Sequence, residues 1–163
     1  MDVELRDLLL HVGLLPLYLF LGTARHEWSH AIFARLEGVI VRRVVFWPHW
    51  FRSWQDPTTL DFLYRISYAP KRGYHFHFGT WIWGDGKDPN MSTHLAPYIT
   101  GVLLAIFGAV LMPLIELHNE MHGVLAAIII FWVSPALDLL YNVAKWLLFK
   151  RGDWEKAFSH GRD

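Results

Sequence analysis

Residues Leu8–Ala24 read LLLHVGLLPLYLFLGTA and continue directly into Arg25, His26, Glu27, Trp28, Ser29 and His30. The 17 residues of the first stretch are uncharged and mostly apolar, and the apolar periodicity continues to Leu36. This pattern predicts one helix over residues 8–36, which at 1.5 Å per residue is long enough to cross a hydrocarbon core of about 30 Å. Gly38 then provides a helix stop. We therefore expect a membrane helix whose last turns carry ionisable side chains.

The composition also favours a membrane protein. Hydrophobic residues make up 53% of the 163 residues, aromatic residues make up 16%, and nine residues are Trp. A soluble domain of this length carries fewer apolar residues. The segment before Leu8 is acidic, which argues against a cleaved signal peptide, because such a peptide begins with a basic region. Membrane lipid is therefore an expected partner.

Charge and cysteine content exclude other classes. The formal net charge is zero, so the chain lacks the basic field of a nucleic-acid-binding protein, and no nucleic-acid partner is expected. The chain has no Cys, which excludes disulfides and thiolate ligands to zinc. Any zinc ion would be held by His, Asp, Glu or water.

Residues 39–93 form a β-rich loop. Three segments have the β-branched and aromatic composition, or the alternation, that is typical of strands: Val39–Trp47, Phe62–Tyr68 and Tyr74–Trp83. The last two are expected to form a hairpin across Ala69–Gly73. The segments Pro48–Thr59 and Gly84–Ser92 are expected to be loops. The sequence thus predicts a small antiparallel β-sheet inserted between the first and second membrane helices.

Two further membrane helices are predicted over residues 95–115 and 123–148. The apolar core of the first has no charged residue, and in the second, as far as Ala144, the only ionisable side chain is Asp138. Each is long enough to span a bilayer. The predicted fold class is therefore an α-helical integral membrane protein with three transmembrane helices.

The whole chain, residues 1–163, is expected to form a single membrane-embedded domain that crosses the membrane several times. Residues 149–163 are basic and amphipathic and are expected to lie at the membrane surface. Lys and Arg are abundant in the β-rich loop and in this tail, whereas the turn between the second and third helices contains Glu116 and Glu120 without Lys or Arg. By the positive-inside rule, the loop and the tail are expected to be cytoplasmic.

The spacing of His26, Glu27 and His30 is the pattern His-Glu-x-x-His. On a helix, the two imidazoles share one face, and the carboxylate beside the first can act as a general base. Zinc hydrolases hold their metal in this way. The alternative is a hydrogen-bonded pair of core histidines. The third His of soluble metzincins would fall at Leu36, so that class is excluded.

Asp138 is the expected third ligand. A charged side chain in a spanning helix costs roughly 2.5 to 3.5 kcal/mol, so it is expected to face a partner inside the protein. His30 lies five residues before Arg35 and Asp138 twelve before Lys150, which at 1.5 Å per residue places both on the order of 10 to 18 Å inside the cytoplasmic boundary. We expect Zn²⁺ bound by His26, His30 and Asp138, with a fourth position open for water and Glu27 as the base.

These residues resemble the motifs of the site-2 proteases, which are intramembrane zinc metalloproteases. The first motif is matched by His26, Glu27, His30, Ala31, Ala34, Gly38 and Val39. The second motif, Pro-x-Leu-Asp-Gly, is similar to Pro135, Leu137 and Asp138, with Leu139 where the family usually has Gly. The resemblance implies a core of three spanning helices with strands after the first, zinc ligation by His26, His30 and Asp138, and catalysis by Glu27. It also implies an endopeptidase that cuts membrane-associated or transmembrane substrates.

A rival interpretation is a non-catalytic metal-binding membrane protein, such as a sensor, carrier or chaperone. It would keep His26, His30 and Asp138 but would not need Glu27. A regulatory membrane partner or a homo-oligomer is compatible with either interpretation.

Five further polar residues each have two interpretations. Asn142 lies one turn after Asp138. It can act at the site, either by orienting the Asp138 carboxylate or by donating a hydrogen bond to the substrate carbonyl, or it can make a polar contact with another helix. His94 can be a rival ligand or an interfacial anchor. His75 and His77 are expected on one face of a strand, where they can form a pair of metal ligands or simply face solvent. Arg25 is expected to extend toward the interface or to pair with an acid.

Overall fold

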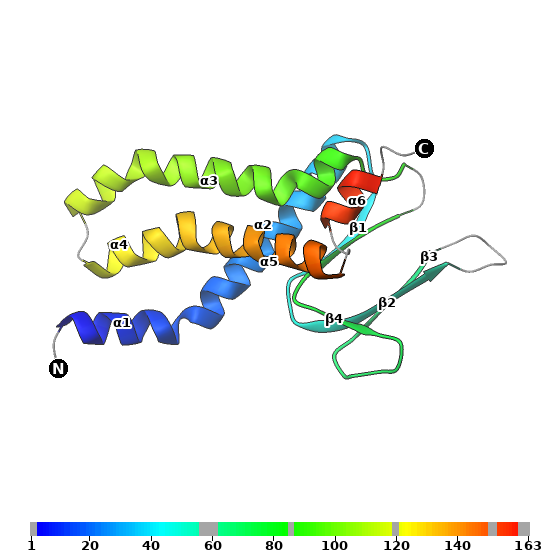
Figure 1. Ribbon diagram of the computed structural model, residues 1–163, viewed down its shortest axis with the longest axis horizontal. Helices are drawn as coiled ribbons and strands as arrows, with labels where there is room; N and C mark the ends of the chain where they lie inside the picture. The colour runs from blue at the N-terminus through cyan, green and yellow to red at the C-terminus, as the bar shows by residue number, and fades with distance from the viewer. Residues whose placement is uncertain (1–2, 56–61, 85–86, 119–120, 150–152, 160–163) are drawn as a thin grey trace.

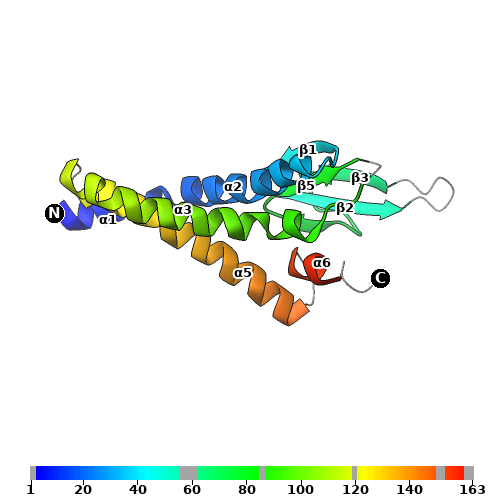
Figure 2. The same cartoon turned by 90° about the horizontal axis from the view of Figure 1, so that it is seen from above.

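The computed structural model describes residues 3–55, 62–84, 87–118, 121–149 and 153–159. Long helices extend to one side and the strands lie at the other end, as Figure 1 and the view from above in Figure 2 show. The elements in chain order are α1 (Val3–Gly13), α2 (Leu15–Leu36), β1 (Val41–Val45), β2 (His49–Gln55), β3 (Phe62–Ser67), β4 (His75–His77), β5 (Thr80–Trp83), α3 (Met91–His118), α4 (Met121–Ile128), the π-helical turn η1 (Ile129–Val133), α5 (Ser134–Phe149) and α6 (Asp153–Ser159).

The prediction of one continuous helix over residues 8–36 is wrong, because the chain is divided at Leu14 into α1 and α2. Pro16 lies in the first turn of α2, where its missing N–H costs no intrahelical bond. The Tyr18 hydroxyl reaches back to Nδ1 of His11 at 2.8 Å. This contact joins the two helices across the division.

The predicted helix stop at Gly38 is confirmed. Gly38 has a φ of +82°, a conformation that glycine adopts without steric cost. The N–H of Gly38 donates to the carbonyl of Arg35, and the N–H of Val39 donates to that of Ala34. These bonds satisfy carbonyls at the end of α2 and turn the chain into β1.

Among the described residues, two helical segments are long and apolar enough to cross a membrane, Met91–Leu117 and Gly123–Phe149. They extend the predicted helices over 95–115 and 123–148 by a few residues. The predicted span over residues 8–36 is not among them.

The second of these segments consists of α4, η1 and α5. The N–H of Ser134 donates to the carbonyl of Ile129, five residues back, which widens the helix at this point. Pro135 follows at once and lacks a backbone donor, so an extra residue in the turn accommodates its ring. Glycines on α3 let this region approach closely, since a Cβ on Gly108 would lie 2.5 Å from Cβ of Phe131.

The strands form two small antiparallel sheets, one of β1 and β5 and one in the order β3-β2-β4. Two sequence expectations are corrected here. The segment Pro48–Thr59 contains β2, the central strand of the larger sheet, and is not simply a loop. The expected hairpin of Phe62–Tyr68 with Tyr74–Trp83 does not form, because β2 lies between β3 and β4. The segment Tyr74–Trp83 itself divides at Gly79 and contributes to both sheets.

The core that supports α2 is a small cluster at the β1–β5 sheet. Ala34, Val39 and Trp81 are buried in it, with Val41, Val44 and Trp83 packed around them. The Trp81 ring also stacks on His30, with ring centroids 5.4 Å apart. The small sheet therefore fixes the face of α2 that carries the motif.

Glu37, at the end of α2, ties this helix to the start of α3. Its carboxylate accepts hydrogen bonds from the hydroxyl groups of Ser92 and Thr93 and, at 3.1 Å, from the backbone N–H of Asn90. The Lys87 ammonium donates to the Glu37 carbonyl at 2.8 Å. Although burial raises the pKa of Glu37, these hydrogen bonds and the Lys87 charge lower it to below its ordinary value.

The described part of the C-terminal tail is α6, which folds back from the end of α5 toward the start of α3 (Figure 1). The ring of Trp154 packs against that of Tyr98 of α3, with centroids 5.2 Å apart and the planes tilted by 37°, and Ala157 is buried. The tail thus packs on the helical core beside α2.

Candidate metal centre

The residues of the His-Glu-x-x-His pattern lie one turn apart in the middle of α2. His26, Glu27 and His30 are buried, and Trp28 between them is exposed. The ring centroids of His26 and His30 are 4.9 Å apart, and their Nε2 atoms approach to 3.2 Å. The predicted pair of imidazoles on one helix face is therefore present.

The other nitrogen of each ring is held by an acceptor. Nδ1 of His26 lies 2.8 Å from Oδ2 of Asp138, and Nδ1 of His30 lies 2.7 Å from the backbone carbonyl of Thr93. A carboxylate and a carbonyl can only accept, so each Nδ1 carries a proton and donates it. In a neutral imidazole this leaves Nε2 as a free acceptor, and both such atoms point toward each other.

A third acceptor completes this arrangement. Oδ2 of Asp153, from α6, lies 3.2 Å from Nε2 of His26 and 3.4 Å from Nε2 of His30. Ligands of tetrahedral zinc, at about 2.0 to 2.2 Å from the metal, are about 3.3 to 3.6 Å from one another. The three separations, including the 3.2 Å between the two Nε2 atoms, thus fit one small cation. Without a cation, one of these atoms must carry an extra proton.

The environment keeps Asp153 ionised. Burial raises the pKa of its carboxyl, but the charge on His30 and the hydrogen bond with His26 lower it more, so the pKa lies well below the ordinary value. The Tyr98 hydroxyl donates a further, longer hydrogen bond of 3.4 Å to the same oxygen. Asp153 therefore directs an anionic oxygen at the imidazole pair.

Asp138, the predicted third ligand, lies on the other side of the His26 ring. Its Oδ2 accepts from Nη2 of Arg25 at 2.5 Å as well as from Nδ1 of His26, and its Oδ1 accepts from Asn142 at 3.0 Å. The structure thus brings Asp138 to His26 but not into the group of three converging atoms, which are from His26, His30 and Asp153. A carboxylate on the outer nitrogen of a ligating His fixes the ring orientation and makes the ring more basic.

The neighbours of Asp138 settle two other sequence interpretations. Asn142 donates both to the carboxylate and to the backbone carbonyl of Asp138, so it orients the acid. Arg25 pairs with the acid and also donates to the carbonyl of Pro97 at 2.6 Å.

Glu27 is buried beside the imidazole pair and packs against the bend between β4 and β5. A Cβ on Gly79 would lie 2.6 Å from Cγ and Oε1 of Glu27 and 2.7 Å from Cγ2 of Thr23. The predicted base is thus next to the predicted ligands and is held by a close glycine contact.

The other histidines that the sequence singles out, His75, His77 and His94, are outside the group of converging atoms. His94 is buried beside His30, with ring centroids 6.3 Å apart. His75 and His77 lie on β4, and the ring of His77 stacks on that of His49 at 6.0 Å. Within the described ranges, the group of acidic and imidazole side chains able to hold a metal consists of His26, His30 and Asp153.

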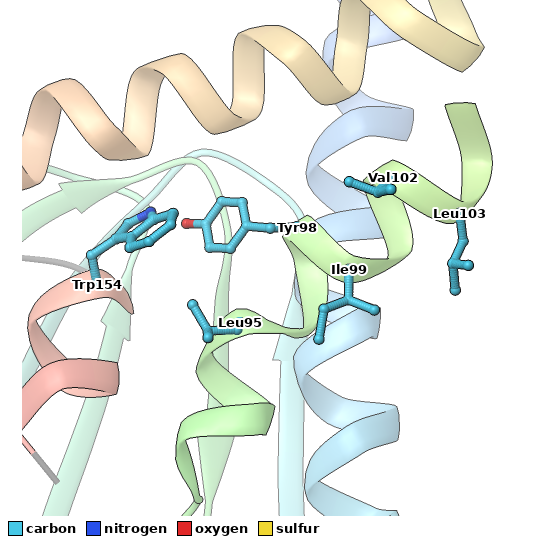
Figure 3. A pocket seen from close by; sticks show the side chains of 6 residues that line it. All are labelled: Leu95, Tyr98, Ile99, Val102, Leu103 and Trp154. Carbon is cyan, nitrogen blue, oxygen red and sulfur yellow. The ribbon is translucent and has the colours of Figure 1, made fainter. Parts of the chain in front are cut away.

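An open apolar groove of about 360 Å³ is lined by Tyr98, whose hydroxyl contacts Asp153, and by Trp154, the next residue in the chain. Five of its lining side chains come from α3 and the sixth is Trp154 of α6, as Figure 3 shows: Leu95, Tyr98, Ile99, Val102, Leu103 and Trp154. The groove therefore joins a hydrophobic surface of α3 to the edge of the candidate metal centre.

Sequence reasoning missed Asp153 and the Thr93 carbonyl. Asp153 opens the short run Asp-Trp-Glu-Lys-Ala-Phe in a tail that was expected to lie at the membrane surface. Its amphipathic pattern does indicate a helix, but no spacing relates it to α2, which lies more than a hundred residues earlier.

Comparison of the chain with family models, with curated proteins and with solved structures finds no match in any of the three. The resemblance to site-2 proteases therefore rests on the two short motifs alone.

Proposed function

We propose that this chain is a zinc-dependent intramembrane endopeptidase of the site-2 protease type. The observation that carries the proposal is the convergence of three acceptor atoms, Nε2 of His26, Nε2 of His30 and Oδ2 of Asp153, at separations that suit tetrahedral zinc. Glu27 lies beside them on the same helix. Three protein ligands leave one coordination position for a reactant, as in catalytic rather than structural sites.

The apolar helices support a location in the membrane. In the most apolar parts of the segments Met91–Leu117 and Gly123–Phe149, only 11% and 6% of the residues are buried inside the protein. Lipid is the solvent that suits such exposed apolar surfaces. We propose that α2 is the third membrane-embedded helix and that the strands and α6 face the cytoplasm, as the distribution of Lys and Arg predicts.

The chemistry follows from the residues around the centre. When bound, zinc supplies Lewis acidity, which acidifies water and polarises a peptide carbonyl. Glu27 accepts the proton of the attacking water and returns it to the departing amine. Asp138 and the Thr93 carbonyl hold the two imidazoles with Nε2 inward, and Arg25 balances the charge of Asp138. The substrate is a membrane-associated or transmembrane segment, since the site adjoins helices with lipid-facing character.

The test begins with metal analysis of the protein purified in detergent. We expect about one zinc per chain, with nitrogen and oxygen ligands only by X-ray absorption. The protein, its Glu27→Gln variant and a control, Glu116→Gln at the exposed far end of α3, are then reconstituted in phosphatidylcholine vesicles with a pool of fluorogenic transmembrane peptides.

We expect Glu27→Gln to bind zinc normally but to lose cleavage by at least about a hundredfold, the range for a general base, while Glu116→Gln cuts normally. A Glu27→Gln protein that cuts at the normal rate would overturn the proposal, as would a native protein that takes up no zinc. Zinc binding without cleavage by the native chain would favour the non-catalytic sensor, carrier or chaperone.

A further inference from the structure

The first two residues of the short helix α6 contact the candidate metal centre and the apolar groove. Oδ2 of Asp153 faces both imidazole Nε2 atoms, and the ring of Trp154 packs against that of Tyr98. The Tyr98 hydroxyl also donates to Asp153 at 3.4 Å. The same two positions thus supply a candidate ligand and one wall of the apolar groove (Figure 3).

Asp138 is already fully engaged. Its carboxylate accepts from Arg25, His26 and Asn142. If it moved to the metal, the Arg25 guanidinium would lose its counter-charge, and Nε of Arg25 is already buried without a hydrogen-bond partner among the described residues. A partly buried guanidinium without a carboxylate is strongly unfavourable. Asp153, by contrast, has its oxygen directed at the imidazole pair.

From this difference we infer that Asp153, and not Asp138, is the third protein ligand of the metal, and that metal binding docks α6 onto α2 and α3. This inference rests on the metal site of the proposed function. With a cation present, the three converging lone pairs share one positive centre. Without it, a single extra proton must be shared among these atoms, and a hydrogen bond of this kind holds Asp153 to the imidazole pair less strongly than coordination of all three atoms to a divalent cation.

A structural consequence concerns the groove. Five of its six lining residues belong to α3, so Trp154 completes it only while α6 is docked. Metal binding therefore completes the apolar groove at the same time as the ligand set. Removal of the metal opens both together.

Hydrogen exchange followed by mass spectrometry tests the docking without any need for activity. The full chain in detergent micelles is compared with and without saturating zinc, and amide exchange is followed in peptides that cover residues 153–159. We expect zinc to slow exchange in this segment at least about tenfold in the native protein and in Asp138→Asn, but not in Asp153→Asn. Unchanged exchange in the native protein, or normal protection in Asp153→Asn, would overturn the inference.

X-ray absorption identifies the ligand directly, because imidazole gives a characteristic multiple-scattering signal. In Asp153→His the number of imidazole ligands is expected to rise from two to three, whereas in Asp138→His it is expected to stay at two. The reverse result would assign the ligand to Asp138 and overturn the inference. The proposed function would then be supported by zinc bound to the two imidazoles and by cleavage that depends on Glu27. Absence of zinc from the native protein would defeat both. If the His variants do not fold, the hydrogen-exchange comparison of the native chain with and without zinc still tests whether metal binding docks α6.

Discussion

The carboxylate of Asp138 lies 2.8 Å from Nδ1 of His26, the ring nitrogen opposite the one that faces His30. This contact is between α5 and α2, and it orients His26 so that Nε2 points into the candidate metal centre. Carboxylates placed in this way usually tune a metal site without touching the metal.

Substitution Asp138→Asn should therefore weaken zinc binding but not abolish it. The side-chain amide can still accept from Nδ1, but it carries no charge to make the ring more basic. We expect a loss of about 10- to 100-fold in zinc affinity, the usual range for such partners, measured by competition with a chromophoric chelator. Glu116→Gln serves as the control. Unchanged affinity would remove Asp138 from the site, and complete loss of binding would favour its predicted role as a ligand.

The ion pair of Arg25 with Asp138 should matter for stability. Both side chains are mostly buried, with exposed fractions of 17% and 16%. Replacing either alone with Leu leaves one charge without its partner, and we expect a cost of roughly 2 to 4 kcal/mol in the free energy of unfolding, somewhat below the range for fully buried pairs. Reversible denaturation in mixed micelles measures this cost.

In the double variant, Arg25→Leu with Asp138→Leu, part of the stability should return, giving an interaction energy of about 1 kcal/mol or more. Arg35→Leu, at an exposed position of the same helix, is the matched control and should cost little. Additive losses in the double variant would mean that the pair contributes nothing beyond its separate residues.

The sequence predicted those features that depend on local pattern. The motif on a helix, the two long apolar helices and the stop at Gly38 all follow from periodicity and residue type. The pairing of Arg25 with an acid could also be expected, because an isolated charge beside a spanning segment needs a partner. The identity of the partner, Asp138, depends on how α2 and α5 pack together, and this packing cannot be read from the spacing of residues in the sequence.

The failures have equally specific causes. Pro48 and the polar residues after it suggest a loop, yet His49 to Gln55 form a strand that pairs with β3 on one side and β4 on the other. The sequence analysis pairs Phe62–Tyr68 with Tyr74–Trp83 because they are neighbours in the chain. In the structure β2 lies between β3 and β4. The sequence analysis misses Asp153 because α6 contacts residues of α2 that lie more than a hundred positions earlier in the chain. No local sequence pattern indicates such a contact.

Glu37 provides a pH-dependent prediction about the junction of α2 and α3. Its pKa in the folded protein is lowered from the ordinary value of 4.5, so the folded state favours the ionised carboxylate. The resulting stability is present above pH 4.5 and is lost as the pH falls through the lower, folded pKa. We expect Glu37→Gln to cost about 1 kcal/mol at neutral pH, as for the loss of a helix-capping carboxylate.

That cost should shrink as the pH falls below about 4.5, since the native carboxyl then becomes neutral as well. Thermal unfolding of both proteins between pH 7 and pH 3 measures the difference. A constant difference over the whole range would mean that hydrogen-bond geometry, and not the charge of Glu37, holds the start of α3.

Gly79 should control the position of Glu27. A methyl group at this position would lie 2.6 Å from Cγ and Oε1 of Glu27, well inside van der Waals contact, so Gly79→Ala must displace either the β4–β5 bend or the carboxylate. If Glu27 is the general base, a shift of about 1 Å is enough to reduce cleavage by about a hundredfold. Zinc affinity should stay within a few-fold, because His26 and His30 are held from other directions. Gly13→Ala, where nothing lies within 4 Å of the added methyl group, is the control for the glycine-to-alanine change itself. Normal cleavage by Gly79→Ala would show that the close contact does not position the base, whereas loss of zinc together with cleavage would mean that Gly79 supports the metal centre as a whole.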